Sequence, residues 1–367
     1  MPPAETATLA ELLWSPNTYW FWTGVAFLYG LFIGSFLNVA IYRLPMGLSV
    51  NKPKRSFCYR CGTTIRWQDN IPVLSYFLLG GKCHSCGVKY GWRYALIEVV
   101  TAVIFAAVFL GANPQGSAAF NFATIWYLAF ASLLIVGTMT DLDHWIIPDE
   151  VTIWGAGAAI LAAVGIGFLD AEPLLALFGP LPALRLSQGQ DFFNIFVDVM
   201  LGPDRIGAGR YTMLWWEPVA NAIIGAAFGS GMLYGIGVIG KLALGKEAMG
   251  FGDVKLFAMI GATLGITGCL VTLMLASFVG LLNTGVLSLT KFFAAGLNSP
   301  LARVKEDLGQ GVPKDDLAAR TVALFASLPK PKPSSHLPFG PAISIAALLV
   351  LIFQFQIRHA IGVWLSL

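Results

Sequence analysis

The stretch that decides the fold runs from Val99 to Thr140, VVTAVIFAAVFLGANPQGSAAFNFATIWYLAFASLLIVGTMT, and its 42 residues include no charged side chain. About 20 apolar residues suffice to cross the hydrocarbon core of a membrane. The run is interrupted at residues 111–116, GANPQG, where two glycines and a proline favour a turn. It therefore predicts two membrane helices, which we place at residues 94–110 and 122–140.

Similar runs occur along the rest of the chain, in which 56% of the residues are hydrophobic and only 12% are charged. This composition is typical of a membrane protein with several spans and not of a soluble domain. The further segments that we expect to cross the membrane are 20–42, 151–169, 218–240, 256–290 as two short helices that meet near Gly265–Gly268, and 337–357. The sequence thus predicts an all-α polytopic protein with about eight transmembrane helices.

Lysine and arginine indicate on which side of the membrane each loop lies. The predicted loops 43–93, 241–255 and 291–332 contain nineteen of these residues, whereas the opposite side contains only four, Arg185, Arg205, Arg210 and Arg358. Because positive residues accumulate on the cytoplasmic side, we expect both termini to face away from the cytoplasm. The net charge of +3 is explained by this topology, so the lipid membrane is an expected partner and nucleic acid is not.

Four of the five cysteines fall in the first loop, as Cys58-Tyr-Arg-Cys61 and Cys83-His-Ser-Cys86. Two such pairs supply the four thiolates that zinc prefers in a structural, tetrahedral site. A pair of disulfides is the alternative, although the loop is expected to face the reducing cytoplasm. His84 lies inside the second pair and is expected to point outward.

Asp141 and Asp253 each stand where an uncharged run meets a short polar turn. Asp141 opens residues 141–149, DLDHWIIPD, and Asp253 closes residues 250–253, GFGD. Ionisable groups at the edge of the hydrocarbon are costly, which makes both functional candidates. If their helices pack together, the two carboxyl groups share a proton, so that one can activate water while the other polarises a scissile carbonyl. The pair is therefore a predicted aspartyl protease dyad.

Spacing alone leaves other interpretations open. In a purely structural one, Asp141 caps or solvates a helix end and Asp253 pairs with Lys255. In a secondary transporter, the two acids would relay protons or cations. A non-catalytic membrane scaffold with a zinc loop would need neither acid.

Several segments together resemble the type IV prepilin peptidases, bifunctional membrane enzymes that remove the basic leader of prepilins and type II secretion pseudopilins and then N-methylate the new terminus. The likeness is carried by 34–45 (GSFLNVAIYRLP), both cysteine pairs, 69–75 (DNIPVLS), 93–98 (RYALIE), 141–149, 245–255 and 338–341 (PFGP). It implies a protein of the bacterial inner membrane with both termini in the periplasm, and it implies that Asp141 and Asp253 are the catalytic pair. The residues expected to shape the turns or contact substrate are Asp143, Asp149, Gly250, Gly252 and Lys255.

The resemblance also assigns methyl transfer to the cytoplasmic loop, with S-adenosylmethionine as the methyl donor. The chain has no glycine-rich Rossmann fingerprint, so this donor must bind differently. The polar residues that we expect nearby are Asn38, Arg43, Asn70 and Glu98, and Arg43 is equally explained as a membrane anchor.

The expected organisation is a non-cytoplasmic tail (1–19), a first transmembrane helix (20–42), a zinc-binding loop (43–93) and a membrane peptidase domain (94–367). No cleavable signal peptide is apparent at the N-terminus. Two stretches exceed the compact pattern of the family, an external one at 170–216 and a cytoplasmic one at 294–336.

Overall fold

The computed structural model describes residues 19–47, 49–51, 55–58, 60–112, 122–169, 217–245, 250–285, 339–354 and 356–357. Within these ranges the regular elements are helices, and strand pairing is limited to two isolated bridges in the loop after the first helix. The predicted insertions 170–216 and 294–336, and the tail up to residue 18, lie outside the described residues.

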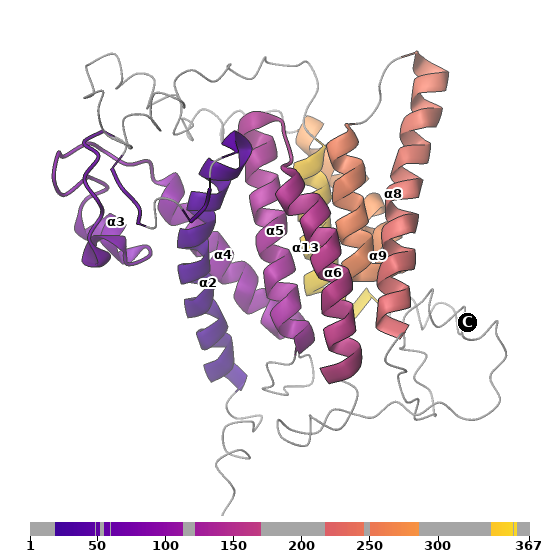
Figure 1. Ribbon diagram of the computed structural model, residues 1–367, viewed down its shortest axis with the longest axis horizontal. Coiled ribbons are helices and arrows are strands. Elements are labelled where there is room, and N and C mark those ends of the chain that lie inside the picture. The colour runs from indigo at the N-terminus through magenta and orange to yellow at the C-terminus, as the bar shows by residue number, and fades with distance from the viewer. Residues whose placement is uncertain are drawn as a thin grey trace, which may run out of the picture.

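Long helices lie side by side and form a bundle (Figure 1). They are α2 (Tyr19–Arg43), α4 (Arg93–Ala112), α5 (Phe122–His144), α6 (Asp149–Leu169), α8 (Glu217–Leu244), α9 (Phe251–Gly285) and the shorter α13 (Gly340–Ile352). The first six are long and apolar enough to cross a membrane. The predicted all-helical, multi-span architecture is therefore confirmed.

Helix α9 consists of two helical halves that meet at Gly265, where the backbone leaves the helical region (φ 69°, ψ −172°). Phe257 and Cys269 would lie roughly 18 Å apart in a straight helix. Both nevertheless lie against Gly229 of α8, so the chain reverses between them. This confirms the prediction of two short helices meeting near Gly265–Gly268.

The helix ends differ from the expectation at one important place. We expected a span to end at Thr140, but α5 continues to His144. The chain leaves the helix at Trp145, which has the left-handed φ of 58° and donates its N–H to the Asp141 carbonyl at 2.9 Å. Asp141 consequently belongs to the last helical turn, where helical geometry fixes the direction of its side chain.

Small residues let the helices approach closely. A Cβ at Gly30 would lie 2.6 Å from the Ala102 backbone, and one at Gly34 would lie 2.7 Å from that of Glu98. Two glycines four residues apart often lie where membrane helices contact each other, because the absence of side chains lets the two backbones approach closely. The glycines thus bring α2 against α4 at Glu98.

The loop between α2 and α4 lies beside these two helices, on one flank of the bundle (Figure 1). It contains the short helices η2 (Leu44–Met46), η3 (Trp67–Asn70) and α3 (Leu74–Leu78). Two isolated bridges, Phe57 with Thr64 and Lys82 with Lys89, close the two cysteine hairpins.

Candidate active sites

Asp141 and Asp253 come together at one end of the bundle. Asp141 is 7% exposed in the last turn of α5, and Asp253 is half-buried in the first turn of α9. The two carboxyl groups are near enough to interact electrostatically. Ile147 lies near both Gly252, next to Asp253, and Gly340, which lies against the Asp141 carboxyl group. Three helix ends, of α5, α9 and α13, therefore form this site.

The neighbouring acids are neutralised by cations. Arg93, at the start of α4, binds both carboxylate oxygens of Asp143, the first of them at 2.7 Å. Lys255 pairs with Asp149 at 2.6 Å, so its ammonium is engaged there and the alternative pairing of Lys255 with Asp253 is not seen. In the part of the chain that the structure describes, Asp141 and Asp253 have no such ion-pair partner.

The local structure does not require the two glycines of the GFGD segment. Neither Gly250 nor Gly252 has a positive φ. A Cβ at either position would find its nearest neighbour among the described residues at 3.7 Å, an ordinary van der Waals separation. Neither backbone geometry nor packing against the described residues therefore demands glycine here.

The four loop cysteines form one cluster. Their Sγ atoms all lie within 4.8 Å of one another, and those of Cys58 and Cys86 are 3.7 Å apart. Four thiolates around a zinc ion at about 2.3 Å lie roughly 3.8 Å apart, so the arrangement fits tetrahedral zinc. The cysteines are free thiols, and no disulfide joins them. His84 is exposed and does not belong to the cluster.

Both hairpins present their thiols in the same way. Gly62 and Gly87, which follow the two cysteine pairs, have φ values of 68° and 70°, and each donates its N–H at 2.9 Å to the carbonyl of the first cysteine of its pair. Burial raises the pKa of the Cys58 thiol to about 12. Burial also opposes ionisation of Cys83, but backbone N–H groups outweigh it and lower its pKa to about 6. A metal ion would have to displace the Cys58 proton.

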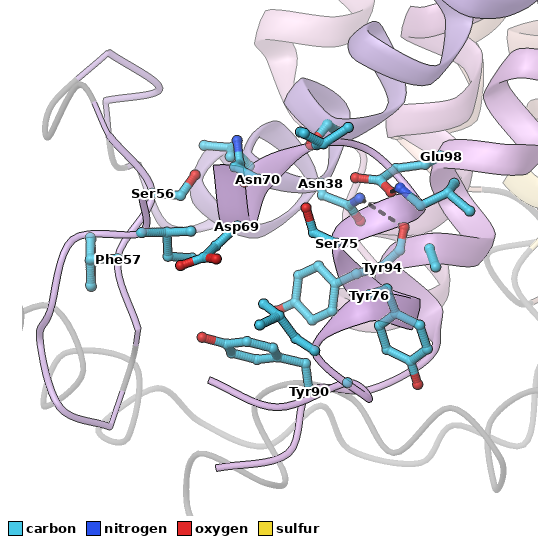
Figure 2. Close-up of a pocket in the computed structure, with 18 of the residues that line it drawn as sticks. Asn38, Ser56, Phe57, Asp69, Asn70, Ser75, Tyr76, Tyr90, Tyr94 and Glu98 are labelled. Carbon is cyan, nitrogen blue, oxygen red and sulfur yellow. Dashed lines mark hydrogen bonds between the residues drawn. The ribbon is translucent and has the colours of Figure 1, made fainter. Parts of the chain in front are cut away.

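Between the loop and helices α2 and α4 lies a cavity of about 220 Å³, hereafter the loop cavity. All four polar residues expected near methyl transfer line it, namely Asn38, Arg43, Asn70 and Glu98. Figure 2 shows Glu98 and Asn38 on the helix side and Ser56 and Phe57 on the opposite, loop side.

Two of these four residues support the surrounding backbone. Asn38 donates its side-chain amide to the Tyr94 carbonyl at 3.1 Å. Arg43 donates to the carbonyls of Ser49 and Val50 at 3.2 and 2.9 Å, which holds the start of the loop. Arg43 thus has a local structural role in the loop.

Sequence reasoning missed the aromatic part of the cavity wall. Tyr76, Tyr90 and Tyr94 line it, and their rings surround one end in Figure 2. Tyr90 also hydrogen-bonds the thiols of Cys58 and Cys83, so it joins the cysteine cluster to the cavity. The available signal was its position four residues after the second cysteine pair.

Comparison with known proteins agrees with these arrangements. Residues 28–112 match the bacterial peptidase A24 N-terminal domain, and residues 206–285 match the type IV leader peptidase family. A prepilin leader peptidase/N-methyltransferase of Myxococcus xanthus is 30% identical, with 93% of this chain and 90% of the relative covered. One of Pseudomonas aeruginosa is 31% identical, with 69% and 76% covered. No solved structure matches. The chain belongs to the prepilin leader peptidase/N-methyltransferase family.

Proposed function

We propose that the chain cleaves the leader of a membrane-inserted prepilin or pseudopilin with Asp141 and Asp253, and that it methylates the new N-terminus at the loop cavity. The observation that carries the first half is the selective pairing of acids. Of the candidate acids that the sequence offered, Asp143 and Asp149 bind cations, whereas Asp141 and Asp253, which interact electrostatically, have no ion-pair partner among the described residues. An acid with a structural role is expected to be neutralised by a cation. The two acids of a catalytic pair are instead expected to share a proton.

The dipoles of the two helices indicate different roles for the two acids. Asp253 lies in the first turn of α9, where the positive end of the helix dipole stabilises a carboxylate. Asp141 lies in the last turn of α5, where the negative end disfavours ionisation. Asp253 is then the base that takes a proton from the attacking water, and Asp141 is the acid that polarises the scissile carbonyl.

The substrate enters from the cytoplasm. The loop 43–93 and the segment 241–255 around Asp253 contain twelve of the 23 Lys and Arg residues, which supports a cytoplasmic location of this end and periplasmic termini. A prepilin inserted by its apolar helix presents its processing site at this interface, where Gly250 and Gly252 keep side chains away from the backbone beside Asp253.

The loop 43–93 together with α2 and α4 forms the methyl-transfer unit, and the remaining helices form the peptidase domain. S-adenosylmethionine supplies an electrophilic methyl group. The aromatic wall of the loop cavity offers faces on which an adenine ring stacks, and its polar residues offer hydrogen bonds. The four cysteines hold a structural zinc ion that fixes Tyr90 and the wall.

The peptidase assignment is tested with purified enzyme and a prepilin substrate. Asp141→Asn and Asp253→Asn are each expected to abolish leader removal, whereas Asp143→Asn retains measurable cleavage. Methylation of a pilin that has already been cleaved serves as the control for folding, because it does not require the aspartate pair. Normal cleavage by both of the first two variants refutes the dyad and leaves the transporter and scaffold alternatives.

Methyl transfer is tested separately, by incorporation of label from S-adenosylmethionine into the cleaved pilin. Ser56→Trp places a large ring into the loop cavity from the loop side. It is expected to stop labelling while leader removal continues. Full labelling by this variant excludes the loop cavity as the site.

A further inference from the structure

Glu98 is an ionisable residue buried inside a membrane helix. It lies in α4, lines the loop cavity and is only 8% exposed. The backbone N–H of Val73 donates to its Oε2 at 2.7 Å, and the side chain of Ser35 also hydrogen-bonds it. Both partners are neutral. A buried carboxylate with only neutral partners is unusual, because burial of a charge ordinarily requires an opposite charge.

The loop is strained where it meets Glu98. Val73 has a φ of 62° and a ψ of −49°, and the N–H of Leu74 donates to the Pro72 carbonyl at 2.6 Å. This is a γ-turn with positive φ, a rare conformation that is costly for a β-branched residue. The turn directs the Val73 N–H at the carboxylate. The fold therefore fixes the position of Glu98 at the expense of local strain, as is common at functional sites.

Two of the other three charged groups of the loop cavity are already engaged. Asp69, the second carboxylate in its lining, pairs with Arg66 at 2.9 Å. Arg43 donates to two loop carbonyls. The third, Lys82, is exposed. Among the described residues, Glu98 is thus the carboxylate of this cavity without an ion-pair partner, and it is suited to a positively charged ligand.

We propose that Glu98 binds the α-ammonium group of the cleaved pilin and accepts its proton before methyl transfer. The proposal rests on methyl transfer at the loop cavity. An ammonium group is not a nucleophile, because its nitrogen has no free electron pair. A carboxylate within hydrogen-bond reach removes this obstacle as a general base.

Two positively charged groups could bind Glu98, the pilin amine and the sulfonium of the methyl donor, and the position of Glu98 favours the amine. Glu98 lies on a membrane helix, five residues into α4 from Arg93, whereas Tyr76, Tyr90 and Asn70 come from the loop. The new amine of a cleaved pilin is joined directly to an apolar membrane helix, so it reaches the cavity from the membrane side. Arg93 contacts Asp143, two residues beyond Asp141, so α4 also borders the peptidase site from which the amine arrives.

The step balances as an acid–base reaction followed by a substitution. The N–H bond of the ammonium breaks and its proton passes to the Glu98 carboxylate, which leaves a neutral amine. The nitrogen electron pair forms the new N–C bond to the methyl group. The S–C bond breaks with its electrons on sulfur, which gives S-adenosylhomocysteine and a methylated ammonium group. Glu98 then returns its proton to water.

The test compares Glu98→Gln and Glu98→Asp with the unaltered protein. Glutamine keeps an oxygen that accepts the Val73 N–H but carries no charge. The substrate is a purified pilin that already lacks its leader, with saturating labelled S-adenosylmethionine. We expect the glutamine variant to lose roughly a hundredfold or more in kcat/KM for the pilin, the usual contribution of a general base. The aspartate variant is expected to lose less, because it keeps the charge.

Two readouts separate this role from a structural one. The affinity for S-adenosylmethionine, measured by equilibrium binding without pilin, is expected to be unchanged in Glu98→Gln, and leader removal remains within about threefold of the parent rate. The free amine titrates near pH 8, so raising the pH from about 7 to 9 supplies neutral amine without a base. The glutamine variant is therefore expected to recover a large part of its methylation at high pH.

Three results overturn the proposal: unchanged methylation by Glu98→Gln, an equal loss of S-adenosylmethionine binding, or a joint loss of leader removal and methylation that high pH does not restore. The Ser56→Trp variant shows whether such a result refutes only the role of Glu98 or also methyl transfer at the loop cavity. If Ser56→Trp stops methylation and Glu98→Gln does not, only the role of Glu98 is wrong. If Ser56→Trp methylates normally, the loop cavity is not the site at all.

Discussion

Gly340 offers a way to disturb the peptidase site without removing an acid. Its Cα lies at the start of α13, and a Cβ there would collide with Oδ2 of Asp141 and lie 3.2 Å from both the Asp141 Cγ and the Ile147 Cδ1. Because non-bonded atoms pack at roughly 3.5 Å, the Asp141 carboxyl group or the end of α13 must move by about 1 Å in Gly340→Ala.

The expected magnitude follows from this displacement. A misplacement of about 1 Å at a reacting group costs on the order of a hundredfold in rate, or roughly 2.7 kcal/mol of activation free energy. Overpacking a well-packed interior lowers the free energy of unfolding by roughly 1–3 kcal/mol. We therefore expect a folded Gly340→Ala variant in which leader cleavage falls about a hundredfold and methylation of a cleaved pilin is retained.

Gly137→Ala is the matched control, since Gly137 precedes Asp141 by one helical turn on α5. A Cβ at Gly137 would meet Val151 and Ile147 at 3.6 and 3.7 Å, which are ordinary contacts. The assay is the rate of leader removal from a prepilin, with thermal unfolding in the same detergent. Parental cleavage by Gly340→Ala, or an equal loss in Gly137→Ala, would falsify the packing of α13 against Asp141.

Three further perturbations test other parts of the structure. Arg93→Met leaves Asp143 half-buried and without its ion-pair partner. Because removal of one partner from a buried pair costs roughly 3–5 kcal/mol of stability, we expect a clear drop in the midpoint of thermal unfolding, and an unchanged midpoint contradicts the ion pair. Removal of zinc with a chelator is expected to lower methyl transfer more than tenfold and to spare leader cleavage, with the metal content measured by elemental analysis. Gly34→Ala forces α2 away from α4 at Glu98, so methyl transfer falls, whereas Gly24→Ala, with no atom within 4 Å of the added Cβ, leaves it unchanged.

Much of the fold was predictable because it depends on local composition. Long uncharged runs, the break after Gly111 and the glycine at 265 are features of short segments, and each corresponds to a helix or a helix end in the structure. The clustering of the four cysteines was predictable for a similar reason, since two closely spaced cysteine pairs in one loop are the pattern of a four-thiol metal site. Their role as zinc ligands and the catalytic role of the acids stay predictions.

The tertiary partners were not predictable. Nothing near Asp143 or Asp149 in the sequence indicates that Arg93 and Lys255, which are 50 and 106 positions away, neutralise them. The expected end of a span at Thr140 was wrong because Asp141–His144 can still hydrogen-bond within the helix, and polarity alone does not stop a helix. The γ-turn at Val73 contradicts the preference of valine for extended backbone, and only the contact with Glu98 accounts for it.

The shortness of one helical segment has a consequence for the surrounding lipid. The first half of α9, residues 251–264, extends only about 20 Å, less than the roughly 30 Å of a bilayer's hydrocarbon core. This segment carries Asp253. A hydrophobic segment that is too short draws the bilayer surface inward. If Asp141 and Asp253 form the proposed catalytic pair, we expect water and the polar start of a substrate helix to reach them at a local depression of the membrane, so that hydrolysis would not require water to cross intact hydrocarbon.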